Sequence, residues 1–365
     1  MTAGRLEQLL SRLARMSIAV VGDFFLDKYL ELDPSLSEAS LETGLEARQV
    51  VAVRCQPGAA GTIVANLCAL GVGRVLCVGF TGDDGEGFEL RRGLQRLGAD
   101  TARVLVCADR FTPTYCKPLV REAGGLRELE RLDTKNRVPL PADLEQALVA
   151  TLDELACQVQ AVIVQDQVQE PDCGVVTAQV RTALAGLAEA HPDVVWFGDS
   201  RARIGQYRNL ITKPNRHELC QAMHLGSPEH KPDDCLPCAA RLARRTGRPV
   251  YLTLGEEGMV LVTPDRAQQL PTARLPGPLD IVGAGDAATA GIVSALCAGA
   301  SFEEAGVMGN LVASITVQQL GTTGTATPAQ VREQFARYRS VWSHVPPALP
   351  IPSTTPGRTT WSAPA

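Results

Sequence analysis

The order of apolar and polar positions along the chain predicts an α/β fold. Short apolar runs rich in β-branched residues lie at 17–22, 74–80, 161–164 and 194–197, and segments with helical spacing lie at 1–15, 143–157 and 175–191. Strand and helix patterns that alternate in this way are typical of βαβ units, in which right-handed crossovers join parallel strands. We therefore expect a central, mostly parallel sheet with helices packed on it.

A glycine-rich turn comes before a long apolar helix pattern near the end of the chain. Gly283, Ala284 and Gly285 lead into Asp286, and an apolar segment follows at 288–297. Glycine lets the backbone turn sharply, and the first amides of a helix have no partner within it, so the turn predicts an anion-binding site. Asp286 is suited to remove a proton from a hydroxyl that attacks a phosphoryl group. The alternative is a plain turn in which Asp286 caps the helix.

Composition narrows the class of protein. A chain of 365 residues with 45% hydrophobic and 21% charged residues is typical of a soluble globular protein, and its net charge of -5 indicates neither a nucleic-acid nor a membrane partner. The eleven cysteines lie mostly in apolar stretches and no signal peptide opens the chain, so we expect a cytoplasmic location. Cys235 and Cys238, with His224 and His230 nearby in a polar loop, leave a zinc or redox site open.

The glycine-rich turn belongs to a longer motif with a known counterpart. Residues 280–287 read D-I-V-G-A-G-D-A, which resembles the signature D-T-x-G-A-G-D of the ribokinase-like (PfkB) carbohydrate kinase family. Other motifs of that family follow in order over residues 16–338. The resemblance implies a three-layer α/β/α fold with a central, mostly parallel sheet and a small β-lid. A kinase domain would span 1–345, with lid insertions at about 28–55 and 105–135, and 346–365 would be a disordered tail.

The same resemblance implies a reaction and its cofactors. ATP would give its γ-phosphoryl group to a sugar hydroxyl, with Asp286 as the base and the amides of residues 283–285 stabilising the charge on the transferred group. Asn215 and Glu218, in the segment P-N-x-x-E, would hold Mg²⁺, although they could equally be a helix cap. Ile281 replaces the usual Thr, which would alter hydrogen bonding or the binding of a monovalent cation such as K⁺. The nucleotide-binding residues implied are Lys213, Asn215, Thr253, Gly255, Gly258 and Asn310.

The substrate side of the resemblance is less regular. Residues 22–27 read G-D-F-F-L-D, similar to the G-D-x-x-L-D of the heptose-phosphate kinase branch. The substrate-binding residues implied are Asp23, Asp27, Gly58, Asn66, Lys117 and Arg131. All of these except Gly58 have a plain alternative: a turn cap for either aspartate, helix packing for Asn66, and surface salt bridges for Lys117 and Arg131. Ala59, Thr62, Gln165 and Gln167 depart from the family pattern and favour a different sugar or sugar phosphate.

These observations lead to one expected function and one rival. The nearest substrate by resemblance is a heptose 7-phosphate phosphorylated at its anomeric hydroxyl. No nucleotidyltransferase region follows the kinase pattern, so we do not expect a bifunctional heptose enzyme, and we expect a homodimer formed through the lid. The rival is a catalytically weak sugar or nucleotide sensor, which Ile281 favours and Asp286 opposes. An NAD-dependent oxidoreductase is excluded, because no G-x-G-x-x-G follows Gly22.

Overall fold

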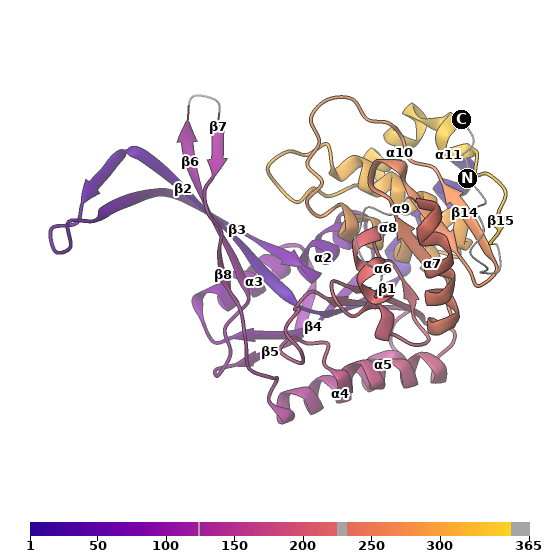
Figure 1. Cartoon of the computed structure of the whole chain (residues 1–365), viewed down its shortest axis with the longest axis horizontal. Coiled ribbons are helices and arrows are strands. Elements are labelled where there is room, and N and C mark those ends of the chain that lie inside the picture. The colour runs from indigo at the N-terminus through magenta and orange to yellow at the C-terminus, as the bar shows by residue number, and fades with distance from the viewer. Residues whose placement is uncertain (123–124, 225–231, 352–365) are drawn as a thin grey trace.

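A long twisted sheet forms the centre of the molecule (Figure 1). The computed structural model describes residues 1–122, 125–224 and 232–351, and within them the sheet runs in the order β15-β14-β13-β12-β11-β10-β9-β1-β4-β5. Its strands are β1 Ser17–Gly22, β4 Arg74–Gly82, β5 Asp100–Cys107, β9 Ala161–Asp166, β10 Val195–Ser200, β11 Ile211–Thr212, β12 Val250–Thr253, β13 Met259–Val262, β14 Arg266–Leu270 and β15 Leu349–Pro350. Neighbours from β12 to β5 are parallel, and β13, β14 and β15 extend one edge in antiparallel pairs.

Helices cover both faces of this sheet. Ile18 and Val20 of β1 pack into a core with one set of helices, whereas Ala19 and Val21 pack into a core with another, as the period of two in a strand requires. The first face carries α1 Ala3–Arg12, α2 Ala60–Ala69, α3 Gly85–Arg96, α8 Ala284–Cys297, α9 Phe302–Thr316, α10 Pro328–Arg337 and α11 Arg339–Ser343. The second carries α4 Ala142–Ala156, α5 Ala178–Ala190, α6 Arg216–Ala222 and α7 Pro232–Thr246. The expected three-layer α/β/α fold with a mostly parallel sheet is confirmed.

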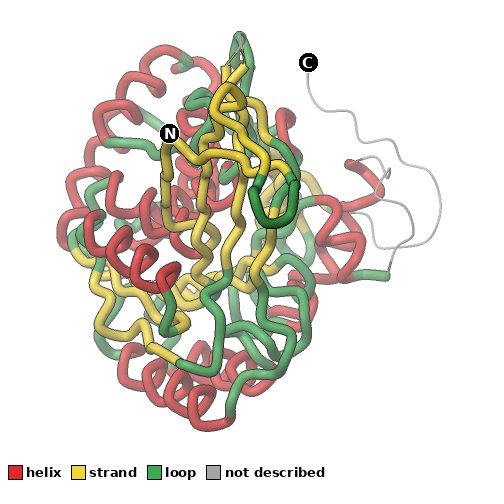
Figure 2. The backbone as a smooth tube through the Cα atoms, turned by 90° about the vertical axis from the view of Figure 1, so that its left-hand side faces the viewer, coloured by secondary structure: helices red, strands yellow, loops and turns green. Residues whose placement is uncertain are grey.

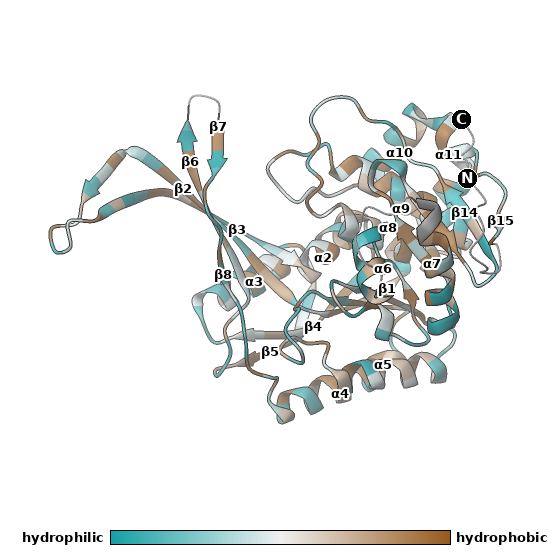
Figure 3. Ribbon diagram, viewed as in Figure 1, coloured by the Kyte–Doolittle hydropathy of each residue, from teal (hydrophilic) through white to brown (hydrophobic). Residues whose placement is uncertain are grey.

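A smaller sheet, called the second sheet below, projects from the body (Figures 1 and 2). It contains β2 Phe24–Ala39, β3 Glu46–Ala59, β6 Thr114–Glu122, β7 Gly125–Glu128 and β8 Leu132–Thr134. The strands run in the order β3-β2-β6-β7, and β8 pairs with β6. Polar and hydrophobic residues are interspersed along β6 and β7 (Figure 3). The first expected lid insertion falls in β2 and β3; the second begins later than expected, because 105–107 belong to β5 of the main sheet.

The structure differs from two of the expectations drawn from the sequence. Residues from Pro346 were expected to be disordered, yet Leu349–Pro350 pair with β14 as β15, while 352–365 lie outside the described residues. Cys235 and Cys238 lie on helix α7 rather than in a loop, and Cys235 is buried. The described residues contain no cluster of three or more His, Cys, Asp or Glu side chains able to hold a metal, and His230 lies outside them. None of the eleven cysteines forms a disulfide bond.

No helix within the described ranges is both long and apolar enough to span a lipid bilayer.

Helices α8 and α9 approach each other closely because glycines lie between them. A Cβ on Gly309 would lie 2.6 Å from Cγ1 of Ile292 and 3.0 Å from the carbonyl oxygen of Ala288. A Cβ on Gly291 would lie 2.9 Å from the carbonyl oxygen of Met308. Packing at this density leaves α8 little freedom to shift, and α8 carries Asp286 in its first turn.

We expect Gly309→Ala to destabilise the protein. The new methyl group meets the backbone of α8, so the free energy of unfolding falls by about 1–2 kcal/mol despite the gain in helix propensity. Gly186→Ala is the matched control, because Gly186 lies on the exposed face of α5 with open space around it. Urea unfolding compares the two variants, and equal stabilities would show that α8 and α9 are not tightly packed.

Candidate active site

The first turn of α8 has the properties expected of an anion-binding turn. Gly283 adopts a left-handed conformation with φ of 79°, and the helix begins at Ala284. Gly283 offers no side chain to cap the helix, and the exposed amide of Gly285 donates no hydrogen bond within the described residues. Asp286, one residue later, is half-buried. The turn therefore presents an unpaired donor and a carboxylate side by side.

A row of polar side chains, called the polar row below, lies beneath this turn. Gln165, the last residue but one of β9, pairs in register with Asp199 of β10, and Lys213 follows β11. The residues two positions earlier, Ile163, Phe197 and Ile211, pack in the core under α8, so the polar row lies on that same face. The sheet thus delivers three polar groups at its carboxyl edge, where α/β proteins bind ligands.

Direct contacts connect the polar row to α8. Nζ of Lys213 lies 2.8 Å from Oδ2 of Asp199, which also accepts a hydrogen bond of 3.3 Å from Oγ1 of Thr289. Nε2 of Gln165 donates to Oδ1 of Asp286 over 3.3 Å. A Cβ on Gly285 would lie 3.5 Å from Nζ of Lys213, so this ammonium group lies directly under the anion-binding turn.

The electrostatics of this cluster suit proton transfer near neutral pH. Burial and the Asp199 carboxylate, with Glu218 adding a further negative charge, raise the pKa of Asp286 to about 7. Lys213 and Arg201 act in the opposite direction. A carboxyl group with a pKa near the working pH, half-buried beside an unpaired amide, is well placed to act as a general base.

Asn215 and Glu218 form a helix cap at the start of α6. Oδ1 of Asn215 accepts from the Glu218 amide over 2.9 Å, and Oε2 of Glu218 accepts from the Asn215 amide over 2.8 Å. The helix cap that the sequence offered as the alternative role of Asn215 and Glu218 is therefore present in the structure. Glu218 still has Oε1 outside the cap, and burial together with Asp199 raises its pKa to about 7. A nearby cation would therefore stabilise the ionised form of Glu218.

The other predicted nucleotide-binding residues separate into two groups. The amide of Thr253 donates to the carbonyl of Pro214 over 3.0 Å, which places the β12–β13 turn and exposed Gly255 beside Lys213 and Asn215. Asn310 differs from the expectation: its Nδ2 donates to the carbonyls of Leu270 and Pro271, both over 2.9 Å, and so joins α9 to β14. Gly258 is buried, and a Cβ there would lie 2.7 Å from the carbonyl oxygen of Leu270.

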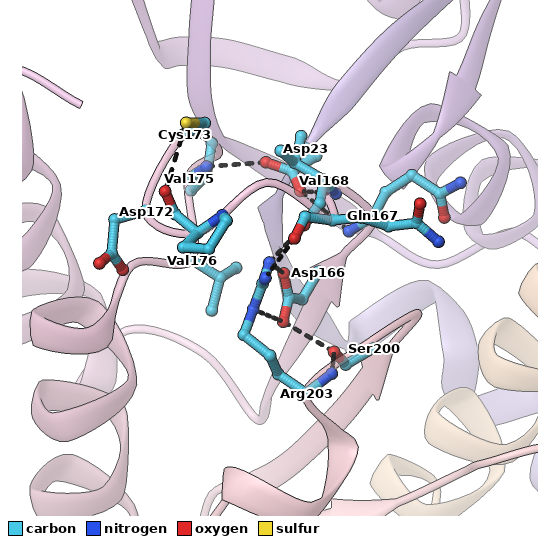
Figure 4. Close-up of polar contacts among 12 residues, drawn as sticks. Asp23, Asp166, Gln167, Val168, Asp172, Cys173, Val175, Val176, Ser200 and Arg203 are labelled. Atoms are coloured by element: carbon cyan, nitrogen blue, oxygen red, sulfur yellow. Dashed lines mark hydrogen bonds and ion pairs between the residues drawn. The ribbon is translucent and has the colours of Figure 1, made fainter. Parts of the chain in front are cut away.

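Asp23 has a structural role that its motif did not predict. It is 3% exposed, and its carboxylate accepts from the amides of Gln167, Val168 and Val175 over 2.9, 2.8 and 2.7 Å (Figure 4). These bonds hold the loop after β9 in place and leave the carboxylate occupied. The structure therefore does not present Asp23 to a sugar.

Asp166 and Arg203 anchor the same loop from below. Arg203 binds both carboxylate oxygens of Asp166, with a shortest distance of 2.6 Å, and also donates to the carbonyl of Val168 (Figure 4). Oγ of Ser200 donates to Asp166 over 2.7 Å. Sequence reasoning did not single out Arg203, because an arginine in an irregular segment carries no signal of the strand end that it will contact.

Asn66 is also enclosed. It is 0% exposed, and its Nδ2 donates to the carbonyls of Thr62 and Gly324 over 3.0 and 3.3 Å. The contacts of Nδ2 fit the helix-packing alternative for Asn66, while its buried Oδ1 has no hydrogen-bond partner among the described residues. Thr62 is nearer to the site, since a Cβ on Gly283 would lie 3.2 Å from its Cγ2.

Asp27, Gly58 and Lys117 come together on the second sheet. Nζ of Lys117 lies 3.0 Å from Oδ1 of Asp27, and both side chains are largely buried. A Cβ on Gly58 would lie 2.4 Å from Oδ2 of Asp27, so only glycine leaves room for that carboxylate. Arg131 is exposed, pairs with Asp133 and stacks on Tyr115, with Cζ 4.1 Å from the ring centroid. The surface salt bridge considered for Arg131 is therefore present.

Arg54 is a cation of this surface that sequence reasoning missed. Its Cζ lies 4.0 Å from the ring centroid of Tyr29, and Nζ of Lys117 lies 4.9 Å from the same centroid. Within the described residues no carboxylate pairs with Arg54. Next to it on β3, Nε2 of Gln56 donates to Oγ1 of Thr323 over 3.0 Å. A Cβ on Gly283 would lie 3.3 Å from Cγ2 of Thr323, so this face of the second sheet reaches the turn before α8.

Curated relatives share much of the chain. The bifunctional protein HldE of Azorhizobium caulinodans is 31% identical over 88% of this chain and 64% of its own length. The HldE of Pelobacter propionicus is 28% identical over 89% of this chain and 64% of its own length. The chain thus spans slightly less than two thirds of these relatives.

Solved structures have the same fold at low sequence identity. Arabidopsis thaliana ribokinase complexed with ribose and ATP has a TM-score of 0.64 at 18% identity, covering 87% of this chain and 98% of that one. Phosphofructokinase-2 from Escherichia coli in complex with substrates and products has a TM-score of 0.65 at 16% identity, covering 89% and 99%. These likenesses confirm the expected ribokinase-like fold.

A family model covers most of the chain as well. The pfkB family of carbohydrate kinases matches residues 28–330, a range that includes the second sheet, the polar row and the turn before α8. This match extends over more than half of the chain and establishes the family. The chain belongs to the pfkB family of carbohydrate kinases.

Proposed function

We propose that this carbohydrate kinase transfers the γ-phosphoryl group of ATP to a hydroxyl of a phosphorylated sugar, with a heptose 7-phosphate and its anomeric hydroxyl as the first candidate. The observation that supports the reaction most directly is the pairing of Asp286, whose pKa is raised to about 7, with the unpaired amide of Gly285. The Asp286 carboxylate can accept a proton, and the Gly285 amide can bind negative charge. Phosphoryl transfer requires these two functions close together.

The proposed step is an in-line displacement. The sugar hydroxyl gives its proton to Asp286, its oxygen bonds to the γ-phosphorus, and the bond from that phosphorus to the bridging oxygen of ADP breaks. The amides of Gly283 and Gly285, which donate no hydrogen bond among the described residues, stabilise the charge on the transferred group, whereas the amide of Ala284 already donates to the carbonyl of Ile281 over 3.1 Å. Lys213 beneath the turn adds a positive charge. Thr253 and Gly255 lie on the side of Lys213 where the nucleotide would bind.

The residues present fit Mg²⁺ in part. The carboxylates of Glu218 and Asp199 both lie near the ammonium group of Lys213, so negative charge exceeds positive charge there. Oε1 of Glu218 lies outside the helix cap. We assign the metal to Glu218, with Asn215 holding that carboxylate in place. Mg²⁺, when bound with ATP, would neutralise phosphate charge. A K⁺ site stays a prediction, since Ile281, 77% exposed, has no side-chain oxygen where the family has a Thr.

Cations on the second sheet support a phosphorylated acceptor. Lys117 is paired with Asp27, whereas Arg54 stacks on Tyr29, donates one hydrogen bond to the carbonyl of Gly321 over 3.4 Å and pairs with no carboxylate among the described residues. A guanidinium with free donors is suited to bind a phosphate through two hydrogen bonds. The motifs similar to the heptose-phosphate kinase branch, together with the relatives named HldE, make heptose 7-phosphate the first sugar phosphate to test.

We expect Asp286→Asn to lower kcat by about 10²–10⁴-fold, because the amide cannot accept the proton of the sugar hydroxyl. ATP binding should remain, since the turn at 283–285 and Lys213 are unchanged. The measurement is ADP release with a panel of sugars and sugar phosphates, together with the Kd for ATP by calorimetry.

The wild-type pH profile gives an internal control for this variant. The base works when deprotonated, and its pKa is raised to about 7, so kcat/KM rises with pH through about 7 and then levels. This limb should disappear from Asp286→Asn. Sugar-independent ADP release, or an unchanged kcat in the variant, would contradict the role of Asp286, and ATP binding without any turnover in the wild type would favour a sensor.

For Arg54→Leu we expect the KM for the sugar phosphate to rise about 10–100-fold, because a charged hydrogen bond to phosphate is lost. The KM for ATP should be unchanged. Arg48→Leu is the matched control, since Arg48 lies farther out on β3 and pairs with Glu46. Equal KM values in the two variants would remove Arg54 from the phosphate site.

We also propose that two copies associate through the second sheet in the cytoplasm. Exposed apolar side chains on this sheet support association: Val51 and Val53 on β3, Leu126 on β7 and Leu132 on β8. The absence of a disulfide bond among the eleven cysteines fits a reducing compartment. Sedimentation velocity should report a dimer that Val53→Lys shifts toward the monomer, and a wild-type monomer at micromolar concentration would contradict the proposal.

A further inference from the structure

The carboxamide of Gln165 is buried and only half satisfied. Gln165 is 5% exposed, and Nε2 donates to Oδ1 of Asp286 over 3.3 Å. Oε1 is buried and has no hydrogen-bond partner among the described residues. An unpaired buried acceptor costs stability, so its presence beside the base calls for an explanation in terms of a ligand.

The backbone holds Gln165 in a fixed place. Its carbonyl oxygen accepts from the amide of Asp23 over 3.0 Å, and a Cβ on Gly22 would lie 2.1 Å from that oxygen. On the other side it pairs in register with Asp199. Contacts with the two neighbouring strands therefore fix the backbone position of Gln165, and its carboxamide extends from there to Asp286.

The surrounding charges determine which end of the amide faces Asp286. A carboxylate accepts hydrogen bonds, so the NH₂ group must point toward it and the oxygen must point away. Asp199 and Glu218 add negative charge to the same cluster, which makes an oxygen facing Asp286 still less favourable. A glutamate at position 165 would add one more carboxylate, and a leucine would remove the donor. The side chain must donate a hydrogen bond to Asp286 and must add no negative charge to the cluster. A neutral group with a donor at one end and an acceptor at the other fits both requirements.

We propose that Gln165 positions Asp286 and selects the sugar. Nε2 holds the Asp286 carboxylate toward the reacting hydroxyl, and Oε1 accepts a hydrogen bond from the hydroxyl on the neighbouring carbon. The acceptor must therefore carry two adjacent hydroxyl groups. For an anomeric acceptor the second hydroxyl is the one on carbon 2. This inference rests on the proposed kinase reaction with Asp286 as its base.

A purely structural glutamine would behave differently in one measurable respect. Gln165→Leu loses the hydrogen bond to Asp286 on either reading, so the difference lies in how the variant treats the acceptor. If Gln165 only supports the fold, the variant still distinguishes a sugar from its deoxy analogue; if Oε1 binds the neighbouring hydroxyl, the variant loses that preference. Gln169→Leu is the control, because Gln169 is exposed in the same segment and its side chain makes no contact in the described structure.

The experiment compares Gln165→Leu, Gln169→Leu and the wild type with two acceptors. The first is the sugar phosphate with the highest ADP release, heptose 7-phosphate being tested first, and the second is its deoxy analogue without the neighbouring hydroxyl. In Gln165→Leu we expect kcat to fall about 10–100-fold and the KM for the sugar to rise about 2–10-fold, with the KM for ATP unchanged. The wild type should prefer the full sugar over the analogue by about 2–10-fold in KM, and Gln165→Leu should show no preference.

The outcomes separate this proposal from the one on which it rests. Wild-type turnover that is lost in Asp286→Asn but unchanged in Gln165→Leu overturns the role of Gln165 and leaves the kinase reaction intact. A Gln165→Leu protein that still distinguishes the two acceptors shows a structural glutamine and also overturns it. If the wild type releases no ADP with any sugar, the proposed reaction fails and this inference fails with it.

Discussion

Excess negative charge under the first turn of α8 is the constraint on which the site depends. Asp286, Asp199 and Glu218 share a small, poorly hydrated space with one lysine, Lys213. Carboxylates that repel each other in such a space hold their protons more tightly, which brings the pKa of Asp286 close to neutral. The close packing of α8 on α9 prevents the helix from moving away to relieve this repulsion. The fold thus maintains a state that the isolated side chains would not adopt.

Local patterns in the sequence were sufficient to predict the parallel sheet and the glycine-rich turn that precedes α8. Alternating apolar runs indicated the parallel sheet, and glycines before an apolar segment indicated the turn at 283–285 with Asp286 on α8. Such features depend on a few residues that are neighbours in the sequence, so the folded protein retains them. The capping alternative for Asn215 and Glu218 was foreseen for the same reason, since both partners lie within one helical turn.

The structure differs from the sequence-based roles where long-range contacts decide what a polar group does. Asp23 is occupied by amides more than 140 residues away, and Asn310 is occupied by carbonyls about 40 residues before it. A motif specifies which residue stands at a strand end but not which backbone groups will surround it. Arg54 escaped notice because its importance comes from an aromatic ring on the neighbouring strand, and Gln165 stood out only as a departure from the family pattern.

The contact of Gln56 with Thr323 joins two parts of the molecule that would otherwise act separately. Thr323 lies against Gly283, so this hydrogen bond links β3 of the second sheet to the turn that precedes α8. In the proposed reaction, an acceptor that binds against β3 would therefore also order the anion-binding turn before phosphoryl transfer, and it would thereby disfavour hydrolysis of ATP by water.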